Sequence, residues 1–200
     1  MGIGYQSVDR HVIDYDLWFM PGSNLALRGP RMDTEKLDIG KTVCCIGAAQ
    51  TFGRFVHRPF ATQIGALLQK PVLNLGVSGA GPEFYLGKPD LMGLLARADT
   101  VIVQSMSARS VTAGRFRTGA NNGVLEFVDG PPEGLQRLAE AAYRLLREEY
   151  GEDAFQQQVA AVQAKWLDLH RDLAGQIKGR KVFLWLSSKK PGENVNLERT

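Results

Sequence analysis

The chain has 200 residues, of which 44% are hydrophobic and 22% charged, and its formal net charge is +3 at pH 7. These values are ordinary for one globular domain with one substantial core. The lysines and arginines are scattered and form no stripe with interleaved aromatic residues, so we expect no nucleic-acid-binding function. No apolar run approaches the roughly 18 residues that a membrane span needs, and the first residues do not follow the pattern of a secretory signal. We therefore expect a cytoplasmic protein.

Residues 1–40 carry several turn signals and predict an extended N-terminal arm rather than a separate domain. Three aromatic residues, Tyr15, Trp18 and Phe19, lie just before Pro21. Large aromatic side chains bury much apolar area, so we expect this cluster to cover the core of the domain. Stacking on a ligand is the alternative.

The remaining residues, 41–200, predict a single α/β domain. Short, continuous apolar runs are typical of parallel strands that are buried on both faces. Four such runs are present: "KTVCCIG", "PVLNLG", "DTVIVQS" and "RKVFLWLSS".

Helical patterns separate the first three of these runs. The stretch "RFVHRPFATQIGALLQK" predicts a helix that begins near Pro59, and "KPDLMGLLARA" predicts a second, shorter helix. The segment "SGAGPEF" between them is expected to be a loop. Strands that alternate with helices at this spacing predict a three-layer α/β/α fold with a parallel sheet and right-handed crossovers.

The two cysteines, Cys44 and Cys45, are adjacent in the first apolar run. Neighbouring residues of a strand point to opposite faces, so we expect no disulfide between them. Their spacing is not that of a zinc site, and no metal site is expected. Buried thiols are the simplest interpretation.

Residues 106–132 interrupt the α/β alternation. The pair Asn122-Gly123 is a strong hairpin-turn signal, and a small β excursion or an ordered loop fits this segment. A segment of this length is too long for a passive connection, so we expect it to help build a site.

Residues 133–178 predict a helical hairpin. Its first helix places apolar residues on one face, namely Leu135, Leu138, Ala142, Leu145 and Leu146. Its second helix carries apolar residues from Phe155 to Ile177 at nearly heptad spacing. This pattern leaves two alternatives open, a stripe that faces the core of the domain or a coil that pairs with a partner.

Ligands of parallel α/β sheets bind at the carboxyl ends of the strands, so the loops that follow the four runs are candidate site segments. The loop after the first run leads toward a helix and offers backbone N–H groups that could hold an anion. The loop after the second run, "NLGVSGAGP", is rich in glycine, which lets backbone approach a ligand closely. Amides, hydroxyls and arginines suit a carbohydrate, a phosphate or a sulfate. The candidate ligand-binding residues are Gln50, Thr51, Arg54, Ser78, Gly79, Gln104, Ser107 and Arg109.

A structural alternative exists for the two central candidates. Gln50 and Gln104 could instead satisfy buried backbone groups across neighbouring strands. The sequence leaves this alternative open beside the ligand-binding one.

Residues 43–109 resemble the opening blocks of the SGNH (GDSL-like) hydrolases. That family has a first block Gly-Asp-Ser-x-Thr-x-Gly, a helix that often begins at Pro-Phe, a second block Asn-x-Gly-x-x-Gly and a third block Gly-x-Asn-Asp. The resemblance implies a flavodoxin-like parallel sheet of strand order 2-1-3-4 with a fifth strand. The matching framework residues here are Gly47, Thr51, Gly53, Pro59, Phe60, Asn74, Gly76 and Gly79.

The catalytic residues of that family do not match. Ala49 stands where the family has its nucleophilic serine, and Ala48 where it has aspartate. In the third block Ala108 and Arg109 occupy the asparagine and aspartate positions. Of the oxyanion donors, Gly79 alone remains, through its backbone N–H.

The general base of that family is also missing. It belongs to an Asp-x-x-His block after the fifth strand, and none of His11, His57 and His170 lies in such a context. A serine hydrolase needs its nucleophile and base within hydrogen-bond reach, so we expect no serine hydrolysis. A natural chain longer than these 200 residues is left open.

Two further resemblances bear on function. The "GAAQTFG" loop and the "VQSMSARS" stretch look like those of an uncharacterised group of alphaproteobacterial proteins. A weaker likeness runs to capsule-polysaccharide acetyltransferases that bind coenzyme A, in which glutamines follow the first and third strands. Gln50 and Gln104 are the matching residues, which implies coenzyme A as a possible cofactor.

Three functions are therefore weighed. The first is a non-classical SGNH-like domain that binds or modifies a carbohydrate or another polar or anionic small molecule. The second is a coenzyme A-dependent acyltransferase of polysaccharide biosynthesis. The third is a non-enzymatic interaction module that uses the long heptad-like helix. A homo-oligomer through helices 133–178, or through an exposed sheet edge, is an expected partner arrangement.

Overall fold

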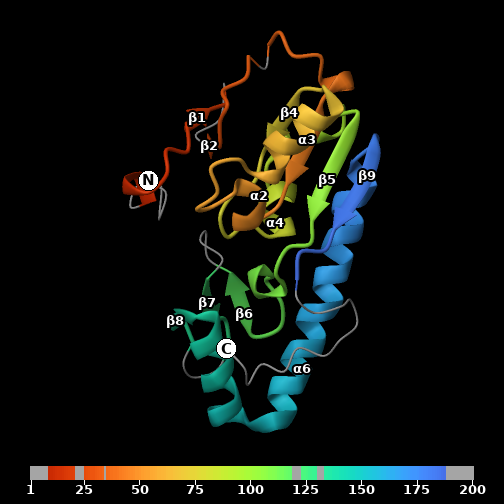
Figure 1. Ribbon diagram of the computed structural model, residues 1–200. Coiled ribbons are helices and arrows are strands. Elements are labelled where there is room, and N and C mark those ends of the chain that lie inside the picture. Colours follow the sequence, from red (N-terminus) through yellow and green to blue (C-terminus); the bar gives the residue numbers. More distant parts are fainter. Residues whose placement is uncertain (1–8, 21–24, 34, 119–122, 130–132, 188–200) are drawn as a thin grey trace.

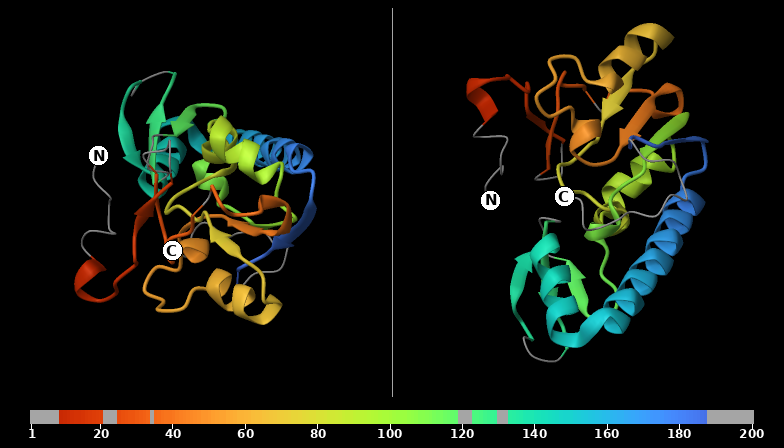
Figure 2. Two further views of the ribbon diagram at one scale, coloured as in Figure 1. Left: turned by 90° about the horizontal axis from the view of Figure 1, so that it is seen from above. Right: turned by 60° about the horizontal axis from the view of Figure 1, so that its bottom comes forward.

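The computed structural model describes residues 9–20, 25–33, 35–118, 123–129 and 133–187. Its larger body is built on a parallel four-stranded sheet in the order β4-β3-β5-β9 (Figure 1). Seen from above, helices cover both faces of this sheet (Figure 2, left). The prediction of an α/β fold with a parallel sheet is confirmed. The strands are β3 (Val43–Ile46), β4 (Val72–Asn74), β5 (Thr100–Gln104) and β9 (Arg180–Leu184).

The central strand β3 is apolar throughout because both of its faces are buried. Cys44 and Ile46 belong to the main core on one face, and Val43 and Cys45 pack with the smaller cluster on the other face. The two thiols are free, and burial raises the pKa of Cys45 to about 12. The prediction of separate, buried thiols is therefore confirmed.

The helices near the sheet largely follow the sequence pattern. Helix α3 (Phe60–Leu68) starts directly after Pro59, as predicted, and α5 (Pro89–Leu95) buries its leucines. The segment that follows β3 forms the short helix α2 (Ala49–Phe52). The prediction of a loop over "SGAGPEF" is wrong at its end, because α4 (Pro82–Leu86) starts there with a proline in its first turn and Tyr85 turned into the core.

The N-terminal residues lie along the sheet body as short elements. These are η1 (Asp9–His11), β1 (Trp18–Phe19), β2 (Ala26–Leu27) and η2 (Ile39–Lys41). Tyr15 and Trp18 are buried, whereas Phe19 is exposed. The Tyr15 ring packs edge-on against Phe52 with ring centroids 4.9 Å apart. These contacts favour the core-covering interpretation of the aromatic cluster.

A small lobe lies beyond the carboxyl ends of β5 and β9 (Figure 1). It contains η3 (Ala108–Ser110) and an antiparallel sheet of β6 (Phe116–Thr118), β7 (Val124–Phe127) and β8 (Gln136–Leu138). The predicted β excursion is confirmed in its strands, while the turn residue Asn122 lies outside the described residues.

The prediction of a helix from residue 133 onward is wrong for its first turns. Gln136–Leu138 instead form β8, whose residues pair with Val124–Glu126 of β7. Leu138 is exposed there, and Leu135 packs on the core of the small lobe. The neighbouring strand supplies cross-strand hydrogen bonds, which override the helical spacing of the leucines.

Helix α6 (Ala139–Gln176) turns back on itself at Gly151, whose φ of 83° and ψ of 175° are not helical. Its two arms are joined at an angle at the far end of the small lobe (Figure 2, right). Leu173 of this helix and Ile177, which directly follows it, belong to the main core beside the sheet. Val162 and Leu169 pack against Val111 in a separate cluster. The apolar stripe of the long arm therefore faces the protein's own interior. The described residues contain no helix long and apolar enough to cross a membrane.

A buried arginine fixes the N-terminal elements to the sheet body. The Arg28 guanidinium lies 4.7 Å from the Tyr15 ring centroid and donates hydrogen bonds to the backbone oxygens of Gly53, Val56 and His57 at 3.0, 2.7 and 3.2 Å. We expect Arg28→Met to lower the free energy of unfolding by about 2–3 kcal/mol, because one buried and two partly buried hydrogen bonds lose their charged donor. Urea denaturation measures the change. The matched control Arg31→Met alters an exposed arginine, and an equal loss in both variants would contradict the expectation.

A second prediction concerns His170 on α6. Its Nδ1 lies 2.9 Å from the Trp166 carbonyl, its Nε2 meets no partner among the described residues, and burial lowers its pKa below the ordinary 6.5. The unfolded chain then binds a proton at a pH where the folded chain does not, so stability falls as the pH decreases from about 7 to about 5. We expect His170→Leu to flatten this decrease, measured by urea denaturation across the range. The exposed His57, changed to Gln, is the control, and an unchanged slope in His170→Leu would refute the prediction.

Candidate functional site

Gln104, the last residue of β5, is the centre of the candidate site. Its side chain is 3% exposed. The carbonyl oxygen Oε1 accepts hydrogen bonds from the Ala48 N–H at 3.0 Å, the Thr51 N–H at 3.2 Å and the Thr51 hydroxyl at 2.7 Å. The amide nitrogen Nε2 donates to Gln50 Oε1 at 3.0 Å. One amide group thus ties β5 to the whole turn after β3.

This arrangement reduces the number of backbone N–H groups that the loop after β3 has available for a ligand. The sequence predicts that N–H groups of this loop could hold an anion. Two of them, from Ala48 and Thr51, already donate to the neutral oxygen of Gln104. The structural role foreseen for Gln104 is therefore present in the fold, and Gln50, an exposed residue, lies beside it at the surface.

Gly47, which directly follows β3, allows the turn after β3 to approach Gln104 of β5 closely. Its φ is +152°, and a Cβ at this position would collide with the side chains of Thr51 and Gln104. The glycine is therefore required by both backbone conformation and space.

Tyr85 of α4 is a central residue that sequence reasoning missed. Its fully buried hydroxyl accepts the Gly47 N–H at 3.0 Å and lies 2.9 Å from the Leu75 carbonyl, so it bridges the ends of β3 and β4. Burial raises the pKa of this phenol well above its usual value, so it acts as a neutral hydrogen-bonding group. The signal that could have found it is a tyrosine three residues after a proline that starts a helix.

Asn74 joins the second loop to the first. Its Nδ2 donates to the Thr51 carbonyl at 2.9 Å, and its Oδ1 accepts the Gly76 N–H at 3.0 Å. A Cβ on Gly76 would collide with the backbone between Thr51 and Phe52. The two loops are therefore packed backbone against backbone, which explains the glycine and asparagine of this framework.

The two candidate arginines form ion pairs. Arg54 Nε lies 2.8 Å from Asp9 Oδ2, and this bond lowers the pKa of the aspartate. Arg109 Nη1 lies 3.1 Å from Glu140 Oε1 at the start of α6. Both guanidinium groups therefore already face a carboxylate.

The other candidates lie on neighbouring loops. Ser78 and Gly79, whose φ is +74°, are partly buried in the loop after β4. Ser107 is exposed, and its Oγ accepts the Arg109 N–H at 3.2 Å, which caps η3. The structure thus brings Gln50, Thr51 and Gln104 into direct contact and distributes the remaining candidates around them.

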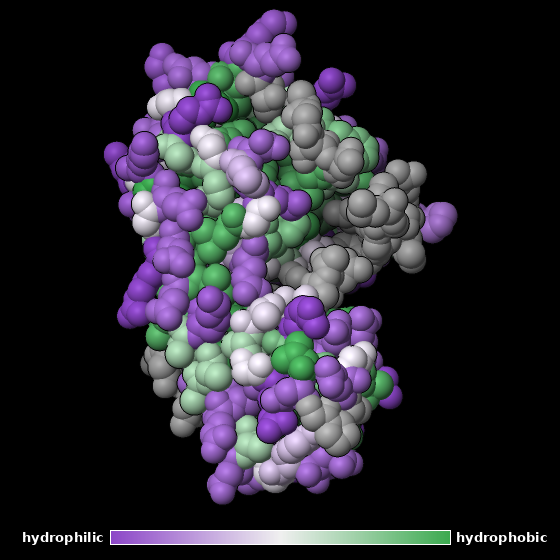
Figure 3. Space-filling model, turned by 180° about the vertical axis from the view of Figure 1, so that it is seen from behind, coloured by the Kyte–Doolittle hydropathy of each residue, from purple (hydrophilic) through white to green (hydrophobic). Residues whose placement is uncertain are grey.

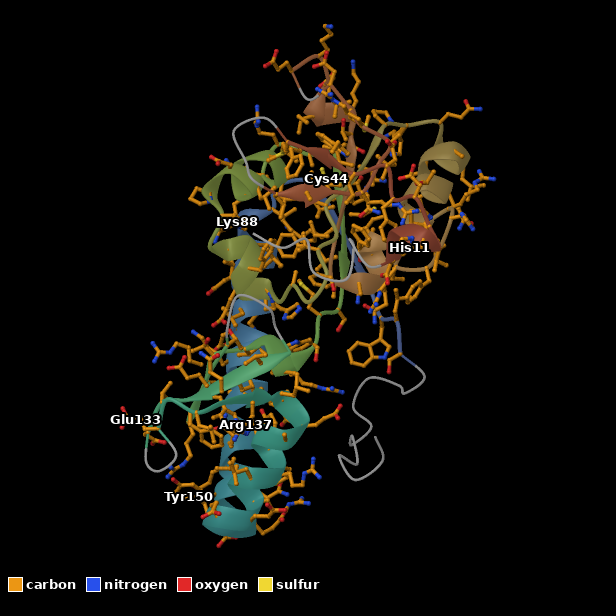
Figure 4. All side chains as sticks on the ribbon, turned by 90° about the vertical axis from the view of Figure 1, so that its left-hand side faces the viewer. His11, Cys44, Lys88, Glu133, Arg137 and Tyr150 are labelled. Atoms are coloured by element: carbon orange, nitrogen blue, oxygen red, sulfur yellow. The ribbon has the colours of Figure 1, made fainter. Side chains whose placement is uncertain are left out.

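No serine–histidine pair is hydrogen-bonded among the described residues. His11 lies on the N-terminal side of the sheet body, far from the small lobe with Arg137 and Tyr150 (Figure 4). His170 is buried in α6, where its Nδ1 hydrogen-bonds the backbone carbonyl oxygen of Trp166 in the same helix. The described site therefore offers neutral amides, hydroxyls and backbone groups rather than a nucleophile with a base.

A separate groove of about 170 Å³ opens at the β4 edge of the sheet, between the N-terminal elements and α3. It is lined by apolar and small residues such as Trp18, Met32 and Ala66, together with Lys70. None of the candidate ligand-binding residues lines it.

The network around Gln104 makes a prediction about stability. Gln104→Leu removes the acceptor of three donors, and we expect the free energy of unfolding to fall by about 2–3 kcal/mol. Gln50→Ala removes one exposed partner, and the loss should stay below about 1 kcal/mol. Urea denaturation of both variants checks the difference. Equal losses would show that Gln104 is not the structural centre of the loop.

Comparison with known proteins gives one family. No curated protein matches the chain. A family model described as "Domain of unknown function (DUF6473)" matches residues 3–118. This stretch contains the N-terminal elements, the strands β3, β4 and β5 with their loops, and β6. Since the match covers more than half of the sequence, the chain belongs to the DUF6473 family.

Proposed function

We propose that this domain binds a neutral polar ligand, most simply a saccharide, at the carboxyl ends of its parallel strands and does not hydrolyse it by serine chemistry. The observation that carries the proposal is the Gln104 amide, which holds the loop after β3 from Ala48 to Thr51 in place. The loop is rigid and lacks a nucleophile, which suits recognition better than acyl transfer to water.

The fold is proposed to be a degenerate member of the SGNH-like group. The order β4-β3-β5-β9 and the tight packing of Gly47, Asn74 and Gly76 support this assignment. The alanines at positions 48, 49 and 108 then mark a cleft that has kept its framework and changed its use.

The charges around the cleft favour a neutral ligand over an anion. Arg54 and Arg109 are paired with Asp9 and Glu140, so an anion would have to displace a carboxylate. Amide and hydroxyl groups both donate and accept hydrogen bonds, as the hydroxyls of a saccharide require. Gln50, Ser78 and Ser107 are the groups of this kind with exposed surface.

A coenzyme A-dependent acyltransferase is the second candidate. The 3.0 Å contact between Gln50 and Gln104 supports it, because it brings together the two glutamines on which the likeness depends. The ion pairs of Arg54 and Arg109 weigh against it, because the phosphates of coenzyme A need cationic partners. Calorimetry with millimolar coenzyme A tests this candidate, and measurable heat would favour it over the saccharide proposal.

The absence of serine hydrolysis gives one prediction. We expect neither the natural chain nor Ala49→Ser to turn over p-nitrophenyl acetate above the uncatalysed rate, because a serine without a base nearby is a weak nucleophile. A stopped-flow assay that follows the absorbance of the released p-nitrophenolate would detect even an acyl-enzyme burst. Turnover by the natural chain would contradict the proposal, and a burst in Ala49→Ser alone would reveal a base that the loop geometry does not provide.

Ligand binding gives a second prediction. In NMR titrations with a panel of neutral mono- and oligosaccharides, we expect amide shifts to cluster in the loops after β3, β4 and β5. Gln50→Ala should weaken binding by about tenfold, the effect of one lost hydrogen bond. Gln157→Ala, an exposed glutamine on α6, is the matched control. Shifts confined to other surfaces, or none at millimolar saccharide, would contradict the proposal.

A further inference from the structure

Strand β9 forms one edge of the main sheet. It pairs with β5 on one side, and no other described strand pairs with its outer side. Residues Arg180–Leu184 make up the strand, and Trp185 and Leu186 follow it directly. This segment is called the β9 edge below.

The β9 edge is unusually apolar for an exposed strand. Val182, Phe183, Trp185 and Leu186 are 43, 55, 45 and 44% exposed, whereas β3 and β5 are buried throughout. Seen from behind, the molecule exposes hydrophobic side chains among its polar ones (Figure 3). Several consecutive large apolar residues on an open sheet edge are typical of a surface that pairs with another strand.

The backbone of this edge is ready for such pairing. The Arg180 N–H donates to the Asp99 carbonyl at 2.9 Å, and the Leu184 carbonyl accepts the Ser105 N–H at 2.9 Å. Even-numbered residues therefore direct their backbone groups toward β5. Because these directions alternate along a strand, Lys181 and Phe183 direct theirs outward.

We propose that the β9 edge pairs with the β9 edge of a second copy of this chain, antiparallel and about a two-fold axis at Phe183. In this register Phe183 faces Phe183 of the second copy, and Lys181 faces Trp185 of the second copy. Both are pairs of residues with outward backbone groups, so the hydrogen-bond pattern of an antiparallel ladder is met. The two four-stranded sheets become one continuous sheet.

The distribution of charge selects this arrangement. The two cations of the strand, Arg180 and Lys181, both lie at its beginning. Parallel pairing in register would place like charges opposite each other, which is unfavourable. Antiparallel pairing separates them to the two ends of the ladder, so that like charges no longer face each other.

The side chains fit the same register on both faces. Val182 and Leu184 lie on the face of the sheet on which α3 packs, where Leu184 contacts the cluster around Ala61 and Val182 is exposed. Val182 of one copy would meet Leu184 of the other across the axis. Phe183 lies on the opposite face and would pack on its own copy. The alternative oligomer surface, the apolar stripe of α6, is buried inside one chain.

The first test is the oligomeric state. Sedimentation equilibrium of the full chain, whose mass is 22.0 kDa, should give a dimer. We expect Phe183→Lys to weaken dimerisation at least about 100-fold, because it places two like charges on the symmetry axis. Leu67→Lys changes an apolar side chain on α3 that is 82% exposed, and it should leave the dimer intact. A monomeric natural chain, or equal dimerisation of both variants, would overturn the proposal.

The second test fixes the register. Residues that face each other in a hydrogen-bonded antiparallel pair have Cα atoms about 5.5 Å apart, within the range of a disulfide. Phe183→Cys should therefore form a covalent dimer under mild oxidation, and Leu67→Cys should not. Hydrogen exchange gives an independent readout, with protection of the Lys181 and Phe183 amides that is lost on dilution. Protection that persists in a monomer would mean that the edge is covered within one chain, which overturns the proposal.

Discussion

The fold around the candidate site depends on one acceptor atom, Oε1 of Gln104. Two backbone N–H groups and one hydroxyl of the loop after β3 converge on it. A buried oxygen with three donors is fully satisfied, and each donor is fixed in direction. The close approach requires glycine at position 47, and the glycine in turn brings its N–H to the hydroxyl of Tyr85. The geometry of three loops follows from this single contact.

This constraint also decides what chemistry the loop can perform. In a loop of this kind the converging N–H groups are the usual place for an anion or an oxyanion. Here a neutral side-chain oxygen from the neighbouring strand takes two of those donors. The alanines at positions 48 and 49 are consistent with this use, because a side chain with its own acceptor would compete with Gln104 for the same N–H groups. The two alanines and the central glutamine therefore have one explanation.

Local sequence patterns predicted the four strands of the main sheet and most helices. They failed where contacts with residues distant in the sequence determine the local structure. The apolar runs around Cys44 and Ile102 could only be buried strands. The β8 segment has the leucine spacing of a helix, but it pairs with β7 and forms a sheet, in which Gln136 lies opposite Glu126, ten residues earlier in the chain. The positions of the candidate residues in loops at the strand ends could be predicted because these loops follow from the topology. Tyr85 and the carboxylate partners of the two arginines could not be found, because those contacts span 31–45 residues of chain.

The exposed β9 edge is a consequence of how the helices are placed. The long arm of α6 covers the face of β5 that carries Val101 and Val103, with Leu173 and Ile177 in contact with the same core. On the other face α3 lies over β3 and β4, and Ala61 packs there with Cys45 and Ile102. Leu184 of β9 packs against this cluster, whereas Val182 and Phe183 stay exposed. A strand as apolar as β9 would normally be buried on both faces, as β3 is, and its sequence fits a sheet that continues beyond it. Pairing of two such edges satisfies in one step both the apolar side chains and the outward backbone groups.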